Sequence, residues 1–360
     1  MSPQGLLPPL ANGVDPQREY PLVSRPPDNL YRYAENYMLA IYDPRLDLGM
    51  WLHLGTCPDD FTLWEEQALL ALPGDQGMLW TRSSSRPSPA ERPGGPTMRW
   101  EIIEPFARMR VRFDGIGVRT PYAEMMAGRV RDGQQELFAF DLMIEAVGPV
   151  WDNHRSAAGS AGRGSMEKQS WASEHYQQTF RATGTVTVDG KPEPFDGTGT
   201  RDHSRGQRGH KPRSFGGHNL WSAPFASGKA FGMQRMWTPE GDATLDVGFV
   251  FVDGRYYDTD LLSPPAYLER MALSGEPLEL IMRSELGEHR ITGVVRRTLF
   301  CTLGEPWGYQ FGADLDCPRG LFAPGFCEFD WDGEKGWGLA ERSGRVGVVP
   351  FAHRGEEAAG

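Results

Sequence analysis

The feature that most constrains this chain is a repeated pattern of alternating runs that end in Asp-Gly. Apolar residues recur at every second position in these runs, as one buried face of a β-strand requires. Asp-Gly after such a run supplies the positive φ angles of a tight hairpin. The four pairs are Asp114-Gly115, Asp189-Gly190, Asp253-Gly254 and Asp332-Gly333. The pattern predicts a meander of antiparallel strands.

Other segments support an all-β fold. The clearest alternation lies at residues 108–113 and 138–144, and the 44 Gly and 29 Pro suit many short strands. Residues 64–72 fit either a helix or a strand, and residues 265–272 predict a short helix. No glycine-rich nucleotide-binding pattern follows a strand, which argues against Rossmann and P-loop enzymes. We therefore expect a β-barrel or β-sandwich in each half of the chain.

The length of 360 residues allows two domains. We expect a disordered or extended segment at residues 1–25 and a first domain at residues 26–155. A small-residue stretch predicts a flexible linker at residues 156–170, followed by a second domain at residues 171–352. A Ser- and Pro-rich stretch at residues 82–96 is expected to be a long loop within the first half.

Composition excludes several classes of protein. The net charge of −11 and the lack of a dense basic run argue against nucleic-acid binding. The four cysteines, Cys57, Cys301, Cys317 and Cys327, lack zinc spacing and are expected to be buried free thiols of a reducing compartment. No secretory signal and no run of about 20 apolar residues is visible. These observations predict a cytoplasmic protein without an integral membrane segment.

The densest polar segment runs from Gly197 to Gly206 and contains Arg201, Asp202 and His203. An Asp beside a His and an Arg is a possible proton donor or acceptor whose pKa its neighbours can shift. Strand alternation separates these residues. One face would carry Thr200, Asp202 and Ser204, and the other Arg201, His203 and Arg205. The segment could equally be structural, with Asp202 paired to an arginine and His203 bonded to a backbone carbonyl.

Two other chemistries fit this segment less well. His203, His210 and His218 recur at intervals of seven and eight residues, which fixes no common face for a metal ion. Ser204 lies in no nucleophile elbow and cannot easily use the adjacent His203 as its base. We therefore expect no metal site.

Aromatic residues form the second candidate feature. Trp221, Phe231 and Tyr257 follow the polar segment, and Trp51 lies in the first half. They could fill a hydrophobic core. Alternatively, they could line a wall for an apolar ligand, since some barrels leave their centre open.

The polar segment also carries a family resemblance. Residues 197–208, Gly-Thr-Gly-Thr-Arg-Asp-His-Ser-Arg-Gly-Gln-Arg, are similar to the Gly-x-Gly-x-Arg-Asp-His-Ser-Trp-Gly-x-Arg pattern of the carotenoid 1,2-hydratase/AttH-like superfamily. Residues 327–341 resemble the C-terminal strand pair of its bacterial members. The opening from Glu35 to Leu54 also fits, so the resemblance extends from about residue 30 to 342.

This resemblance implies two lipocalin-like domains in tandem, with a ligand site in or between them and no organic cofactor. It implies acid-initiated hydration, isomerisation or cyclisation of a C=C bond in a terpenoid- or polyene-like molecule. Asp202 would be the acid and His203 its partner in proton handling, while Trp221 or Tyr257 would stabilise a carbocation. Arg201, Arg205, Phe231 and Trp51 complete the expected substrate-binding set.

Arg205 stands where the family has Trp. A cation there would disfavour a nearby carbocation unless it points away or binds an anionic or carbonyl group of the substrate. The first hypothesis is therefore a cofactor-independent hydratase or isomerase/cyclase, present as a monomer or homodimer. The second is a lipocalin-like carrier of an apolar compound. A structural interaction protein is the third, and a barrel centre filled by Trp and Phe would favour it.

Overall fold

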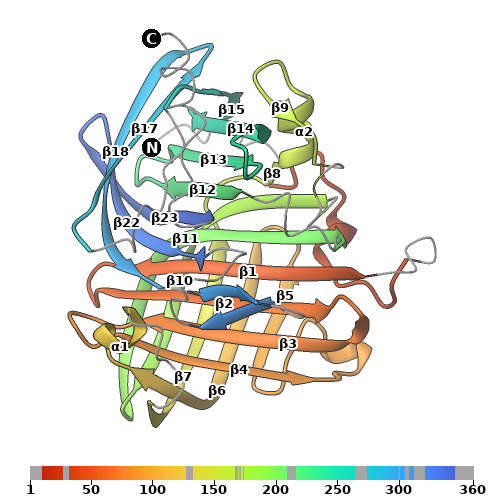
Figure 1. The fold of residues 1–360 in the computed structure, drawn as a ribbon, viewed down its shortest axis with the longest axis vertical. Coiled ribbons are helices and arrows are strands. Elements are labelled where there is room, and N and C mark those ends of the chain that lie inside the picture. The colour runs from red at the N-terminus through yellow and green to blue at the C-terminus, as the bar shows by residue number, and fades with distance from the viewer. Residues whose placement is uncertain are drawn as a thin grey trace, which may run out of the picture.

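The computed structural model describes residues 10–26, 32–126, 133–166, 169, 172, 174–208, 216–263, 274–299, 301–304, 308–311 and 321–344. Two antiparallel sheets dominate these residues (Figure 1), which confirms the predicted all-β class with two lipocalin-like units in tandem. The described helices are short: η1 (Pro16–Glu19), η2 (Pro89–Glu91), α1 (Tyr122–Met126) and α2 (Asn153–Ala158). None of these has the length and apolar character needed to span a bilayer.

The first sheet closes into a barrel. Its strands are β1 (Tyr33–Asp43), β2 (Leu48–Cys57), β3 (Asp60–Ala71), β4 (Met78–Ser85), β5 (Met98–Glu104), β6 (Arg108–Thr120), β7 (Gln134–Ala146), β8 (Trp151–Asp152), β10 (Glu174–Val188) and β11 (Lys191–Gln207). Strand β11 pairs with β1 on one edge and with β10 on the other, which closes a ring of eight strands.

Side chains fill this barrel. Leu52, Trp64, Trp100 and Phe140 belong to one buried cluster that extends across its interior. An eight-stranded barrel is just wide enough to be filled by side chains or to hold one small ligand. In this barrel, buried apolar side chains of the described residues occupy the interior.

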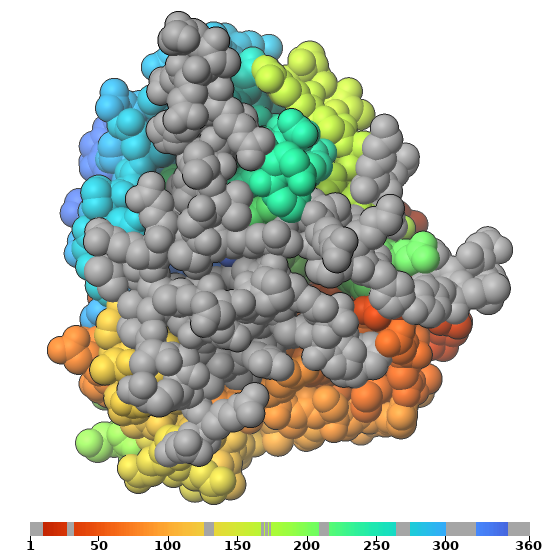
Figure 2. Space-filling view, in the orientation of Figure 1, coloured from red at the N-terminus to blue at the C-terminus, as the bar shows by residue number. Residues whose placement is uncertain are grey.

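The second sheet comes from the rest of the chain. Its strands are β9 (Arg163–Gly164), β12 (Gly217–Pro224), β13 (Ala230–Trp237), β14 (Ala243–Val252), β15 (Arg255–Asp258), β16 (Asp260–Leu261), β17 (Pro277–Ser284), β18 (Gly287–Thr298), β19 (Cys301–Gly304), β20 (Gly308–Phe311), β21 (Leu321–Phe322), β22 (Pro324–Trp331) and β23 (Glu334–Gly344). In Figure 2, β17 and β18 (cyan) lie above the orange and yellow strands of the first sheet.

Three of the four predicted Asp-Gly turns are confirmed. Asp189-Gly190, Asp253-Gly254 and Asp332-Gly333 join β10 to β11, β14 to β15 and β22 to β23, with positive φ at both residues of each pair. The fourth prediction is wrong. Asp114 and Gly115 lie inside β6, where they pair with Ala139 and Phe138 of β7, because the strand continues for five residues beyond them.

Other predictions about local structure can be compared directly. Most of residues 64–72 form part of strand β3 and not a helix. The alternation at 108–113 and 138–144 is confirmed in β6 and β7, where the predicted inward residues are buried: Met109, Val111, Phe113, Phe138, Phe140, Leu142 and Ile144. Residues 82–96 begin in β4 and include η2. Cys57 and Cys327 are buried free thiols. The helix predicted at 265–272 and the side chains of Cys301 and Cys317 lie outside the described residues.

The sheets divide later in the chain than the expected domain boundary. Strands β10 and β11, within the expected second domain, complete the first barrel. The expected linker contains the end of α2 and β9, and Met166 is buried against β14. The segment expected to be disordered or extended was residues 1–25; its described part includes η1 and buries Val14 and Glu19. These segments pair with or pack against residues distant in the sequence, which local composition does not reveal.

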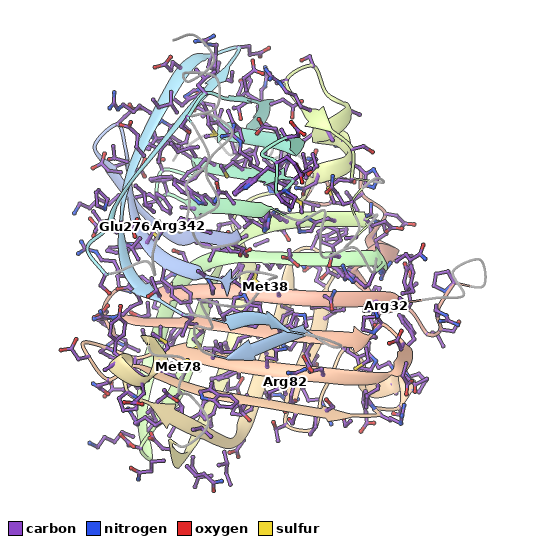
Figure 3. The ribbon with its side chains drawn as sticks, viewed as in Figure 1. Arg32, Met38, Met78, Arg82, Glu276 and Arg342 are labelled. Atoms are coloured by element: carbon purple, nitrogen blue, oxygen red, sulfur yellow. The ribbon has the colours of Figure 1, made fainter. Side chains whose placement is uncertain are left out.

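The two sheets pack together through an apolar cluster. Trp51 and Tyr42 of the first sheet contact Phe322 and Phe326 of the second, with the Trp51–Phe322 ring centroids 5.2 Å apart. In Figure 3, Met38 of this cluster lies on β1, between Arg342 above and Met78 and Arg82 below. Gly49 lets the sheets approach closely, since a Cβ at this position would overlap the ring of Phe326.

Replacement of Gly49 by Ala is expected to weaken this packing. The added methyl group must displace the buried Phe326 ring, and overpacking of this kind costs about 1–3 kcal/mol. Urea denaturation of Gly49→Ala should show that loss, and the double variant Gly49→Ala/Phe326→Leu should lose less than the sum of the single variants. Wild-type stability of Gly49→Ala would contradict the packing described here.

Candidate functional site at the interface between the sheets

Strand β11 divides the polar segment between two environments, as its alternation predicts. Arg201, His203 and Arg205 face the barrel interior, opposite Leu39, Tyr37 and Glu35 of β1. All three are buried, with exposed fractions of 4, 2 and 7%. Asp202 faces the second sheet, and its side chain keeps 17% exposure. The segment therefore belongs to two separate clusters.

The first cluster, the interior network, begins at Arg201. Its guanidinium donates to both carboxylate oxygens of Glu19, at 2.7 and 2.9 Å, and to Oε1 of Gln178 at 2.6 and 3.0 Å. Glu19 comes from η1, whose start is fixed by Pro16 and by Asp15, which accepts a hydrogen bond from the backbone of Gln17. The ion pair thus ties the N-terminal segment to one end of the barrel.

His203 and Arg205 extend the interior network around Glu35. The His203 Nε2 and the Arg205 Nε lie 2.8 and 2.7 Å from Glu35 Oε1. Nδ1 of His203 lies 2.7 Å from the hydroxyl of Tyr176, and its ring stacks on Tyr37 with 4.0 Å between centroids. Arg205 also donates to the carbonyl of Tyr20. Arg205 therefore points away from Asp202, and Glu35 balances its charge.

Electrostatics keep this network in one protonation state. Burial raises the pKa of Glu19, but Arg201 outweighs burial and holds that pKa below its usual value. Burial likewise raises the pKa of Glu35, but His203 and Arg205 lower it by more, so the pKa of Glu35 lies below its usual value. Burial lowers the pKa of His203 despite its bond to Glu35. Two carboxylates and two guanidiniums balance around the imidazole, so removal of one charged partner would leave a buried charge uncompensated.

The second cluster, the interface polar cluster, lies on the opposite face of the same strands. We define it as Asp202 with His53, Gln67, His175 and Gln177. Backbone register places Gln177, Asp202, Met38, His53 and Gln67 side by side on successive strands, so they share one face. Nε2 of His175 lies 3.6 Å from Oδ2 of Asp202. This face turns toward the second sheet, because Met38 belongs to the cluster that joins the sheets.

On β2, Trp51 lies next to His53, a member of the interface polar cluster. Their rings are nearly parallel, with an interplanar angle of 3° and 5.6 Å between centroids. Burial lowers the pKa of His53 to about 4, and the nearby Asp202 carboxylate only partly opposes this effect. An aromatic face, a neutral imidazole and a carboxylate thus lie on one wall.

The second sheet presents its own polar groups to this region. His218 Nδ1 lies 2.9 Å from Glu341 Oε1, and His218 Nε2 lies 3.1 Å from Nε2 of Gln234. Gln234 in turn accepts a hydrogen bond from Asn153 at the start of α2. The sheets are aligned by hydrogen bonds from Thr198 to the carbonyl of Trp337 and from Thr200 to Ser222.

The structure does not gather all the aromatic residues predicted for the site. Trp221 and Phe231 lie in the core of the second sheet with Phe329, and Tyr257 packs against that core. Trp51 alone among the four predicted aromatic residues shares the face of Asp202. The other three lie in another layer because alternation directs their side chains to the inner face of the second sheet.

Sequence reasoning missed several members of both clusters. Glu19 and Glu35 meet Arg201 and Arg205 across more than 160 residues of chain, and nothing local marks them as partners. His175 and Gln177 occupy alternate positions of a strand next to β11, so a correct strand pairing would have found them. His53 was visible within the stretch from Glu35 to Leu54 that resembles the family.

Two further observations bear on ligands. Within the described ranges, no group of three or more His, Cys, Asp or Glu could hold a metal ion, and His210 lies outside those ranges. A hollow of about 530 Å³ lies at the β3–β4 end of the face that carries the interface polar cluster, lined by Cys57, Asp60, Leu63, Glu65, Arg82, Ser83 and Ser84. Its volume is within the range of small-molecule sites.

The fold and the interface polar cluster define a protein of two lipocalin-like units with polar residues between them. A family described as a domain of unknown function, DUF7064, matches residues 21–345, and the chain belongs to this family. No curated protein matches the sequence significantly.

Among solved structures, an AttH-type protein of Nitrosomonas europaea is similar over 91% of this chain and 98% of its own, with 15% identity and a TM-score of 0.53. That likeness shows a common fold. Kievitone hydratase of Nectria haematococca has 13% identity over 92% of this chain and 94% of its own, with a TM-score of 0.45. CghA with Sch210972 has 9% identity over 93% and 96%, with a TM-score of 0.47.

Loss of one member of the buried Glu19–Arg201 pair should strongly destabilise the protein. Arg201→Met leaves the Glu19 carboxylate buried without its cation, a change that typically costs about 3–5 kcal/mol. The double variant Glu19→Met/Arg201→Met should recover a large part of that loss in chemical denaturation. If the single variant is as stable as the wild type, the Glu19–Arg201 pair does not hold the N-terminal segment to the barrel.

The neutral state of His53 has its own pH dependence. Its folded pKa of about 4 lies below the ordinary histidine pKa of 6.5, so its contribution to stability is complete above pH 6.5. That contribution falls as the pH drops from 6.5 toward 4, where only the unfolded chain gains the proton. NMR titration should show a His53 midpoint near 4, and His53→Gln should flatten this part of the stability profile. A midpoint near 6.5 would contradict the assigned environment.

Proposed function

We propose that this protein is a hydratase or isomerase/cyclase of the carotenoid 1,2-hydratase/AttH-like superfamily. The substrate would be a hydrophobic, terpenoid- or polyene-like small molecule held between the two sheets, with Asp202 as the general acid. The observation that carries the proposal is the position of Asp202. Among Arg201, Asp202, His203 and Arg205 it is the one whose side chain is partly exposed, and it adjoins His175 on a face that also carries Trp51.

The chemistry begins with protonation of a C=C bond. The protonated Asp202 carboxyl gives its proton to one alkene carbon, and the π electrons form the new C–H bond. The other carbon becomes a cation. In hydration, water adds to that carbon and loses a proton to the Asp202 carboxylate or to His175, so the net change is addition of one water. In isomerisation or cyclisation, the cation loses a proton to the Asp202 carboxylate after rearrangement or ring closure, so the acid is regenerated and the net composition is unchanged.

The surroundings of Asp202 suit these steps. The face of Trp51 can stabilise a carbocation through its π electrons. The imidazole of His53, neutral above about pH 4, adds no competing positive charge. Arg205, the cation that would oppose a carbocation, is turned into the barrel and paired with Glu35. We therefore assign Arg201, His203 and Arg205 to the interior network and not to the reaction.

Asp202→Asn should abolish turnover and leave folding intact. The amide cannot donate the acidic proton, and loss of a general acid lowers kcat by about 10²–10⁴-fold. The assay incubates the protein with terpenoid alkenes such as farnesol and geranylgeraniol and follows, by liquid chromatography and mass spectrometry, the gain of one water or a changed retention at constant mass.

Asp114→Asn, an exposed change on β6, is the matched control and should retain full turnover. Turnover by Asp202→Asn at the wild-type rate would contradict the proposal. Tight binding of these compounds by the wild type, with recovery of unchanged ligand, would favour the lipocalin-like carrier.

A further inference from the structure

Gln177 on β10 is a buried amide without a partner in the described part of the protein. Gln177 is 2% exposed, and neither its Nε2 nor its Oε1 has a hydrogen-bond partner among the described residues. A buried polar group left unsatisfied costs about 1–3 kcal/mol. Most buried polar groups in proteins are satisfied, so an orphaned donor and acceptor on one side chain require an explanation.

The adjacent glutamine provides an internal comparison. Gln178 points to the opposite face of β10, where its Nε2 donates to the carbonyls of Phe106 and Gly148 at 2.8 Å. Its Oε1 accepts from Arg201. Gln178 is therefore a fully bonded structural amide. Gln177, one residue away, has the same chemistry and no such partners.

The position of Gln177 places its amide beside the proposed acid. It pairs in register with Asp202 on one side and with Trp151 of β8 on the other. Asn153 follows Trp151 by two residues and is also fully buried. The Asn153 Nδ2 is used by Gln234, while its Oδ1 has no partner among the described residues. The two amides together have three atoms without partners among the described residues: the donor Nε2 of Gln177 and the acceptors Oε1 of Gln177 and Oδ1 of Asn153.

This set of atoms selects a chemical group. An anion would face two acceptor oxygens, which would repel it. A hydroxyl group can accept from Nε2 of Gln177 and donate to one of the amide oxygens, so it satisfies both kinds of orphan. A ketone or aldehyde could use only the donor.

We propose that Gln177, together with Asn153, binds a hydroxyl group of the substrate, so that the substrate is an alkene-bearing alcohol or phenol and not a pure hydrocarbon. That the substrate carries an alkene rests on the proposed function. The hydroxyl site itself rests only on the orphaned amides. Gln177 is a specificity-determining residue, since it holds a substrate oxygen that takes no part in the proposed proton transfer.

The test measures binding of three probes that differ at one position: farnesol with a hydroxyl, farnesal with a carbonyl, and farnesene with neither. Tryptophan fluorescence titration of the wild-type protein should give affinities in the order farnesol, farnesal, farnesene. The preference for farnesol over farnesene should be about tenfold, which corresponds to one or two hydrogen bonds. In Gln177→Leu this preference should fall to about one.

Stability separates ligand binding from a structural role. Gln177→Leu removes two unsatisfied buried atoms, so its thermal midpoint should equal or exceed that of the wild type. Gln178→Leu, the matched control, loses bonds to Arg201 and two carbonyls and should be destabilised. A lower thermal midpoint for Gln177→Leu with an unchanged probe preference would overturn the proposal. Equal wild-type affinity for the three probes, or binding of none, would also overturn it.

The inference and the proposed function can fail separately. If Gln177→Leu loses the preference while the wild type never converts farnesol, the hydroxyl site stands and the enzyme proposal fails. If Asp202→Asn abolishes conversion while Gln177→Leu keeps the preference, the enzyme proposal stands and the hydroxyl site is wrong.

Discussion

Strand β11 is hydrogen-bonded along both edges, to β1 and to β10, and the rest of the architecture depends on this double pairing. It closes the first barrel, and it fixes which side of the strand each residue of the polar segment occupies. A strand paired on both sides cannot slip by one residue without turning every side chain to the wrong face. The inward direction of Arg201 and the outward direction of Asp202 are consequences of this register.

Two different tasks follow from the two faces. Inside the barrel, charges are balanced and fully bonded, and they tie Glu19 of the N-terminal segment to a strand 182 residues away in sequence. Outside, the same strands present Asp202, His175 and Gln177 to a second sheet, where the Asp202 side chain keeps 17% exposure and the Gln177 amide has no hydrogen-bond partner among the described residues. Polar groups whose hydrogen bonds are all made within the protein favour stability. Polar groups that lack partners and lie beside an aromatic face favour ligand binding.

Local rules predicted part of this arrangement. Period-two alternation assigned the faces of Asp202 and His203, and Asp-Gly predicted three hairpins. The same rule failed at Asp114-Gly115, because strand β7 pairs through that position and overrides the local turn preference. Long-range pairing could not be predicted: it joins Glu35 to Arg205, brings His175 to Asp202 and sends Trp221 into a different core. Arg205 looked decisive for the substrate because its partner was not visible.

The central claim is that ligands bind between the sheets and not inside the barrel or the second core. Tryptophan indole N–H signals report on these three places, since Trp51 lies at the interface, Trp64 in the barrel and Trp221 in the second core. The measurement is an NMR titration with farnesol, with signals assigned by single Trp→Phe variants. The account predicts that the Trp51 signal shifts and the other two stay in place. A shift of Trp64 or Trp221 with an unmoved Trp51 would contradict it.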